Sequence, residues 1–215
     1  MRFFAAVRPP DAVLDHLSLA LAAVLPQAPG PAPPLLPRAN WHVTLAFYGE
    51  QPDGAEPVLL SALAEALART EPFSLELRGA GVFRRKVGWI GLGGQTAALA
   101  QAMRAAAEAV AEVGRPAPPP LGARPHLTVT RAADRPDVGR ALRALSVYQG
   151  PSWLVTEAHL MSSELGRGPA GHALYSRLGS APLNPGTVLS SQTWGHTLRR
   201  ADSGPEVTFD GLAGS

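Results

Sequence analysis

The feature that most restricts the fold of this chain is a short pattern, His-x-Thr-apolar, that occurs twice in segments with the composition of β-strands. It spans residues 42–45 (His-Val-Thr-Leu) and residues 126–129 (His-Leu-Thr-Val). In a strand, side chains at i and i+2 point to the same face, so each segment presents an imidazole and a hydroxyl together. The apolar residues between them point the opposite way, which predicts that the other face of each strand is buried in a core. A third match, residues 16–19 (His-Leu-Ser-Leu), falls in a predicted helix, where i and i+2 diverge.

The rest of the chain alternates between strand-like and helix-like periodicity. Helices are expected at about 11–25, 54–69, 96–113 and 137–146. Strands are expected at about 2–7, 41–48, 73–78, 86–92, 126–130, 153–162 and 173–178. Each half of the chain has a proline-rich segment, then a strand that starts with histidine, then a helix, then paired strands. This order predicts an internal duplication and sheets faced by helices, in an α+β or α/β layout.

Composition excludes several classes of protein. The chain has no cysteine, so it cannot use disulfides, thiolate nucleophiles or cysteine-bound zinc. A formal net charge of +2 is too small to predict nucleic-acid binding from bulk electrostatics. No apolar run reaches the ~20 residues of a membrane helix. The run between Arg2 and Arg8 is shorter than the ~7–15 residues of a signal-peptide core, so a cytoplasmic protein that binds no membrane is expected.

Two such strands side by side would place two imidazoles and two hydroxyls around one small cavity. Cleaving a phosphodiester without a metal requires a base for the attacking water, an acid for the leaving oxygen and donors for the other phosphate oxygens. Histidine suits both proton roles because its unperturbed pKa of ~6.5 lets either form exist near neutral pH. A metal site built on His42 and His126 is the alternative, but no His-x-x-x-His pattern or carboxylate cluster accompanies them.

Several further segments accompany the twin motif: residues 2–6 (RFFAA), 47–49 (FYG), 82–83 (VF) with 89–91 (WIG), and 124–131 (RPHLTVTR). Together they resemble the LigT-like RNA 2′,3′-cyclic phosphodiesterases of the two-histidine (2H) phosphoesterase superfamily, from residue 1 to about residue 183. The resemblance implies an α+β fold of two lobes, with two antiparallel sheets and outer helices around a central cleft, related by a pseudo-twofold axis. Residues 1–183 would form this domain, and residues 184–215 a C-terminal extension to which we assign no function.

The same resemblance implies an enzyme that hydrolyses the 2′,3′-cyclic phosphate at an RNA end to a 2′-phosphate, with no cofactor and no metal. It implies His42 as proton donor and His126 as proton acceptor, with Thr44, Thr128 and Arg131 binding phosphate. RNA ends would be the partner of a monomeric protein. Two alternatives stay open: a 2′–5′ RNA ligase or a phosphodiesterase for 2′–5′ or small cyclic nucleotides, and a module that binds RNA ends without turnover.

Strand periodicity leaves three positions in question. Arg131 is five residues from His126, so it reaches the phosphate only past the strand end or after a bulge; otherwise it is a surface arginine paired with Asp134. Phe47 is likewise five residues from His42, so it should point to the opposite face and is expected in the core. The role of Tyr48 is left open.

The remaining basic and imidazole side chains are assigned no catalytic role. The basic run at residues 84–86 (Arg-Arg-Lys) either holds an RNA backbone or forms a solvated turn. His159, His172 and His196 are expected to be structural, since no partner pattern accompanies them.

Overall fold

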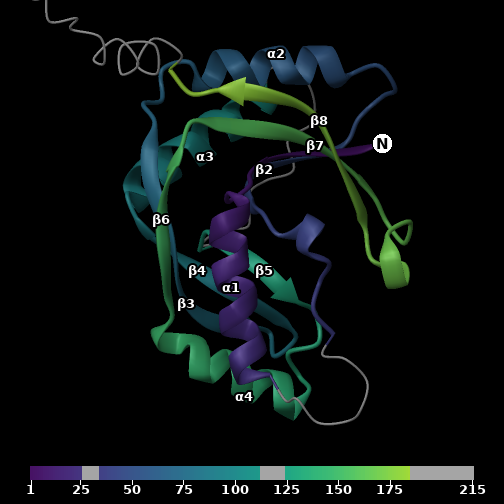
Figure 1. Ribbon diagram of the computed structural model, residues 1–215. Helices are drawn as coiled ribbons and strands as arrows, with labels where there is room; N and C mark the ends of the chain where they lie inside the picture. Colours follow the sequence, from purple (N-terminus) through teal and green to yellow (C-terminus); the bar gives the residue numbers. More distant parts are fainter. Residues whose placement is uncertain (26–33, 112–123, 185–215) are drawn as a thin grey trace, which may run out of the picture.

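The computed structural model describes residues 1–25, 34–111 and 124–184, in which eight strands form one antiparallel sheet (Figure 1). The spatial order of the strands is β6-β3-β4-β5-β2-β1-β7-β8. The strands are β1 (Arg2–Val7), β2 (Val43–Glu50), β3 (Phe73–Phe83), β4 (Val87–Gly94), β5 (His126–Thr130), β6 (Gln149–Val155), β7 (Glu157–Glu164) and β8 (Leu174–Pro182).

Helices pack against both halves of the sheet. They are α1 (Asp11–Val24), α2 (Glu56–Leu67), α3 (Thr96–Ala111) and α4 (Pro136–Ala144), with short 3-10 turns η1 (Arg38–Asn40), η2 (Leu145–Val147) and η3 (Pro169–Gly171). Helices α1 and α4 contact the half with β3, β4 and β6, whereas α2 and α3 pack mainly on the half with β2, β7 and β8, with α3 also touching β3. In α1 the buried side chains are Val13, Leu14, Leu17 and Leu21, the i, i+3/i+4 stripe of a helix with one face in a core. None of these helices is both long and apolar enough to cross a membrane.

The two histidine strands, β2 and β5, are neighbours at the centre of the sheet. They pair at one position, Val43 with Leu127, so the sheet consists of two four-stranded halves joined by a narrow seam. The family resemblance implied two separate sheets; the structure instead joins the halves into one curled sheet through this pair (Figure 1). The seam brings the starts of both motifs together.

The expected strand at residues 153–162 is wrong, because this segment contains parts of two strands. β6 pairs with β3 at one edge of the sheet, while β7 pairs with β1 and β8 in the other half. Thr156 lies between them, and no glycine or proline marks the crossing, so the periodicity gave no sign of it.

The hairpin of β3 and β4 is longer than expected. Gly79 and Gly81 lie inside β3 and do not end it. Gly79 has a positive φ of 67° beside a shift in the register with β4, and Gly81 pairs with Trp89. Glycines that signal a turn in the sequence thus serve here as a bulge and a close approach. The expected extension at 184–215 lies outside the described residues, except for its first residue.

Candidate active site

The five residues expected to act together all line one cleft. Its volume is about 1150 Å³, and its lining includes His42, Thr44, His126, Thr128 and Arg131. The alternation expected of the two strands is confirmed, since Val43, Leu127 and Val129 are fully buried and Leu45 is 4% exposed. Each motif thus turns its imidazole and hydroxyl to the cleft and its apolar residues to the core, with Leu45 also touching the cleft.

Shifts in strand register explain how side chains of the wrong parity reach the cleft. Between Thr128 and Thr130, β5 has one more residue than its partner β4, and Arg131 follows directly after the end of β5. Arg131 therefore lines the cleft although it is five residues from His126. In the described residues it forms no ion pair with Asp134, the alternative that its parity had suggested.

Phe47 is not in the core, so that expectation is wrong. The register between β2 and β1 shifts at two places. Phe47 therefore lies on the cleft side of the sheet, where it is 53% exposed. Tyr48, whose role was open, is instead fully buried and donates its hydroxyl to the carbonyl of Ala106 at 3.2 Å. Tyr48 thus fastens β2 to α3, which forms a wall of the cleft with Met103 and Arg104.

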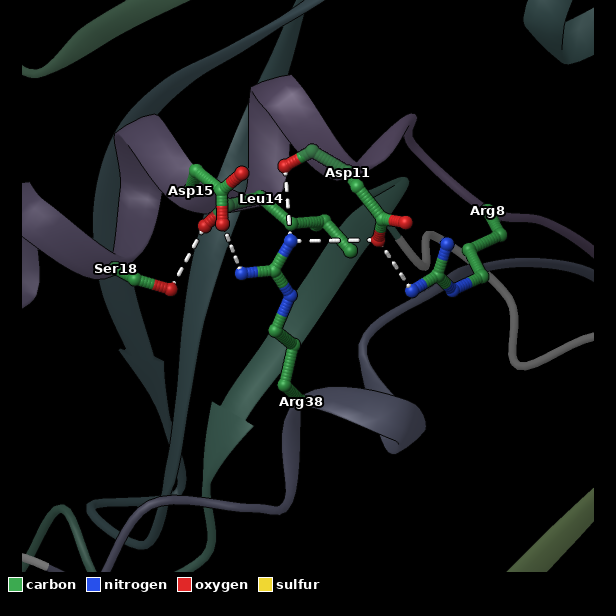
Figure 2. Close-up of polar contacts among 6 residues, drawn as sticks. All are labelled: Arg8, Asp11, Leu14, Asp15, Ser18 and Arg38. Carbon is green, nitrogen blue, oxygen red and sulfur yellow. Dashed lines mark hydrogen bonds and ion pairs between the residues drawn. The ribbon is translucent and has the colours of Figure 1, made fainter.

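The backbone that leads to His42 is fixed to its surroundings by polar contacts. Arg38 of η1 donates to the Asp11 carbonyl oxygen at 2.9 Å and pairs with the carboxylates of Asp11 and Asp15 on α1 (Figure 2). The Asp11 carboxylate also accepts a hydrogen bond from Arg8 at 2.9 Å. Both arginines lower the pKa of this carboxyl, and Arg8 has the larger effect. These contacts of Arg38 hold η1, which ends two residues before His42, against the start of α1.

Two further hydrogen bonds hold the segment before His42 against other strands. The side-chain amide of Asn40 donates to the backbone carbonyl of Ala173, just before β8, at 2.9 Å. The amide of Leu36 donates to the Val129 carbonyl of β5 at 2.8 Å. The position of His42 is thus tied both to β8 and to the strand that carries the second motif.

His42 lies in an aromatic enclosure. The rings of Phe4 on β1 and Tyr175 on β8 are 4.9 Å and 5.3 Å from its ring, and they are 5.1 Å from each other. Burial lowers the pKa of His42 from 6.5 to about 4, because desolvation disfavours the charged form. The Asn40 backbone carbonyl raises it in part, while the positive charges of His126 and Arg131 lower it further. Among the described residues, buried Nδ1 of His42 meets no partner in full hydrogen-bond geometry, so its contact with the Asn40 carbonyl is a weak one.

His126 has a similar aromatic pair, and the backbone carbonyl two residues before it lies in full hydrogen-bond geometry. The ring of Phe83 is 4.9 Å from its ring, and Trp89, stacked on Phe83 at 5.0 Å, is 6.4 Å away. Nδ1 of His126 lies 2.8 Å from the backbone carbonyl of Arg124. A carbonyl can only accept, so Nδ1 carries a hydrogen, and in the neutral ring Nε2 is left with a free lone pair. Nε2 is therefore the atom that can take up a proton.

The other histidines lie elsewhere. His16 is on α1 and its Nδ1 is 3.0 Å from the hydroxyl of Tyr148, which confirms that its motif falls in a helix. His159 is buried beside Ser180, with Nδ1 3.2 Å from the hydroxyl oxygen, and does not line this cleft. His172 follows η3 and does not line it either, and His196 is outside the described residues.

Sequence reasoning missed the aromatic enclosures. Phe4 belongs to a segment that the sequence predicts only as a buried strand, and no local pattern connects Tyr175 to His42, since the two meet only through the order of β1, β7 and β8 in the sheet. In the described parts of the chain, no three His, Asp or Glu side chains gather in a way that could hold a metal ion.

Comparison with known proteins places these residues in context. A sequence model of the family described as the 2′-5′ RNA ligase superfamily matches residues 9–167. A Geobacillus stearothermophilus protein named RNA 2′,3′-cyclic phosphodiesterase is 34% identical over 117 residues, which are 49% of this chain and 35% of that protein. The match thus spans about a third of the length of that relative.

Solved structures share the fold. The Thermus thermophilus protein TT0787 superposes with a TM-score of 0.67 at 26% identity, covering 86% of this chain and 98% of that one. E. coli LigT complexed with NADP+ gives a TM-score of 0.65 at 25% identity, covering 85% and 98%. E. coli LigT complexed with 3′-AMP gives a TM-score of 0.63 at 25% identity, covering 85% and 96%.

Proposed function

This chain belongs to the 2′-5′ RNA ligase superfamily, and we propose that it hydrolyses the 2′,3′-cyclic phosphate at the end of RNA to leave a 2′-phosphate. The observation that carries the proposal is the meeting of two His-x-Thr strands at one seam, with both imidazoles lining one cleft. The name of the Geobacillus relative and the 3′-AMP bound to the LigT neighbour support a nucleotide phosphate as substrate.

In the proposed reaction, water attacks phosphorus in line with the 3′-oxygen. Nε2 of His126 takes a proton from the water as the new P–O bond forms. The bond from phosphorus to the 3′-oxygen breaks, and His42 donates a proton to that oxygen. The products are a 2′-phosphate and a 3′-hydroxyl, and the two histidines have exchanged their protonation states.

The low pKa of His42 sets a condition on this assignment. With a pKa of about 4, His42 is neutral at pH 7 before substrate binds and is not in the imidazolium form that a general acid needs. A phosphate anion beside the ring favours the imidazolium form and opposes the effect of Arg131. We infer that substrate binding raises the pKa of His42 and so prepares it as the acid.

The remaining cleft residues are proposed to hold the phosphate. Thr44 and Thr128 can donate hydroxyl hydrogens to the non-bridging oxygens without adding charge. Arg131 offers a planar guanidinium suited to two phosphate oxygens, and it already acts on His42 electrostatically. These donors lie on the side of both strands that faces the cleft.

The test is product analysis with an oligonucleotide that ends in a 2′,3′-cyclic phosphate, resolving 2′- from 3′-phosphate. His42→Ala and His126→Ala should each lower kcat by roughly 10²–10⁴-fold, the usual loss for a general acid or base. His16→Ala is the matched control, since His16 belongs to the same sequence pattern but lies on α1, and it should keep wild-type turnover.

Three outcomes would overturn the mechanism. Near wild-type turnover in both histidine variants would remove the proposed acid and base. Loss of activity in EDTA, restored by a divalent ion, would favour the metal alternative. Binding of the oligonucleotide without any turnover would favour a module that recognises RNA ends.

A second candidate function is joining RNA ends through a 2′–5′ bond, which the description of the matching family names. It uses the same site, with a 5′-hydroxyl of RNA in place of water. Incubating two oligonucleotides, one with a cyclic phosphate and one with a 5′-hydroxyl, separates the two functions by whether a longer strand appears.

A further inference from the structure

The hairpin turn between β3 and β4 has an unusual combination of backbone and side chains. The amide of Lys86 donates to the carbonyl of Phe83 at 3.0 Å, and the two central residues, Arg84 and Arg85, have φ of 47° and 59°. Positive φ at both central positions is the pattern of a type I′ turn, which strongly favours Asn-Gly. Residues with a Cβ are disfavoured there, so two arginines make the turn less stable than the pattern allows.

The turn lies at the rim of the cleft. Phe83 and Val87, on either side of it, line the cleft, and the ring of Phe83 contacts that of His126. The amide of Ala133 donates to the Lys86 carbonyl at 2.8 Å. This bond places the turn beside the segment that begins with Arg131, a residue of the proposed phosphate site.

The charges of the turn have no carboxylate partner among the residues that the structure describes. Arg84, Arg85 and Lys86 are all exposed. Five other arginines, Arg2, Arg8, Arg38, Arg78 and Arg135, are paired with aspartate or glutamate, whereas the remaining described arginines, like those of the turn, form no ion pair with a described carboxylate. Three unpaired cations held on a strained turn at the rim of a phosphate cleft are suited to a polyanion.

We propose that the turn at residues 83–86 binds backbone phosphates of the RNA strand upstream of its cyclic end. This inference rests on the proposed function and specifies its substrate as an oligonucleotide in preference to a cyclic mononucleotide. Each nucleotide adds one phosphate charge to the strand as it leaves the cleft. Phosphate contacts by arginine and lysine release counterions and give a binding constant that falls with salt.

The backbone geometry provides a variant that separates charge from structure. Arg84→Asn with Arg85→Gly removes both charges and installs the pair that the turn favours, so Tm should stay equal or rise. The kcat/KM for a cyclic-phosphate oligonucleotide should fall roughly tenfold at low salt. Each phosphate contact with single-stranded RNA contributes ~0.7 to the slope of log binding constant against log salt concentration. Losing the two arginines should therefore make this slope shallower by about 1.4. Turnover of a 2′,3′-cyclic mononucleotide should not change.

Arg69→Gln with Arg143→Gln is the matched control, because it removes two exposed charges that do not line the cleft. Wild-type kcat/KM and an unchanged salt slope in the turn variant would overturn the inference, as would an equal loss in the control. Fluorescence anisotropy of a labelled oligonucleotide ending in a 2′-phosphate measures binding at the turn independently of turnover. If wild-type protein binds this probe through the turn but hydrolyses no cyclic phosphate, the proposed function fails and the inference stands.

Discussion

Removing the ring of Tyr175 is expected to raise the pKa of His42. The rings of Phe4 and Tyr175 stand 4.9 Å and 5.3 Å from the imidazole and shield part of it from water. Burial lowers the pKa from 6.5 to about 4, a difference that corresponds to about 3 kcal/mol at ~1.4 kcal/mol per pKa unit. In Tyr175→Ala one of the two walls is replaced by water, so the pKa should rise by roughly one unit.

The assay is an NMR titration of the His42 ring carbon and proton between pH 3 and pH 8. Tyr175→Phe is the matched control, because it keeps the ring and removes only the hydroxyl. Wild-type protein and the phenylalanine variant should titrate alike near pH 4, with the alanine variant above them. A wild-type His42 that titrates at 6.5, or an alanine variant that titrates with the wild type, would refute the role assigned to the aromatic enclosure.

The same burial predicts how stability depends on pH. The unfolded chain protonates His42 near pH 6.5, whereas the folded chain protonates it only near 4. Below pH 6.5 the unfolded state therefore binds more protons, and the free energy of unfolding falls as the pH drops through this window. The loss from His42 reaches about 3 kcal/mol below pH 4 and is absent at pH 7. In urea titrations across pH, His42→Gln should lack this component and Tyr175→Ala should show a smaller one.

Two further predictions concern residues that position the site. A Cβ on Gly81 would lie 2.2 Å from Cζ2 of Trp89, so Gly81→Ala should displace that ring. The free energy of unfolding, measured in urea, should fall by about 1–3 kcal/mol, and the tryptophan emission should change. Arg38→Gln should lower kcat by loosening the approach to His42 while Tm changes little, since exposed ion pairs contribute only ~0.2–1 kcal/mol. Arg135→Gln, which breaks another exposed pair, is its control and should keep wild-type kcat; equal kcat losses in the two arginine variants would contradict the positioning role.

Local periodicity was sufficient to find the elements that carry the site. Alternation in the two motifs identified which side chains face the cleft, because a strand with one buried face repeats every two residues. The helix stripe of α1 likewise marked His16 as remote from the cleft. These features depend on residues within one turn or one strand, where the chain's own geometry decides the outcome.

Features that depend on strand pairing were not predictable in this way. The register shifts that turn Phe47 toward the cleft arise from the match of β2 with β1, which no segment of β2 encodes alone. The division of residues 153–162 between β6 and β7 is likewise decided by which partner each part finds. Tyr175 reaches His42 only because β8 is placed beside β7 and β7 beside β1.

The two motifs are alike in sequence, yet their histidines differ in chemical setting. His126 donates Nδ1–H to the Arg124 carbonyl, which leaves Nε2 ready to accept a proton. His42 packs against the rings of Phe4 and Tyr175, and burial lowers its pKa to about 4, so that without an anion beside it His42 is neutral near pH 7. A phosphate anion beside His42 would favour its imidazolium form while His126 keeps its lone pair. In the proposed mechanism the substrate's own phosphate completes the acid by raising the pKa of His42, an asymmetry between the two histidines that the repeated motif conceals.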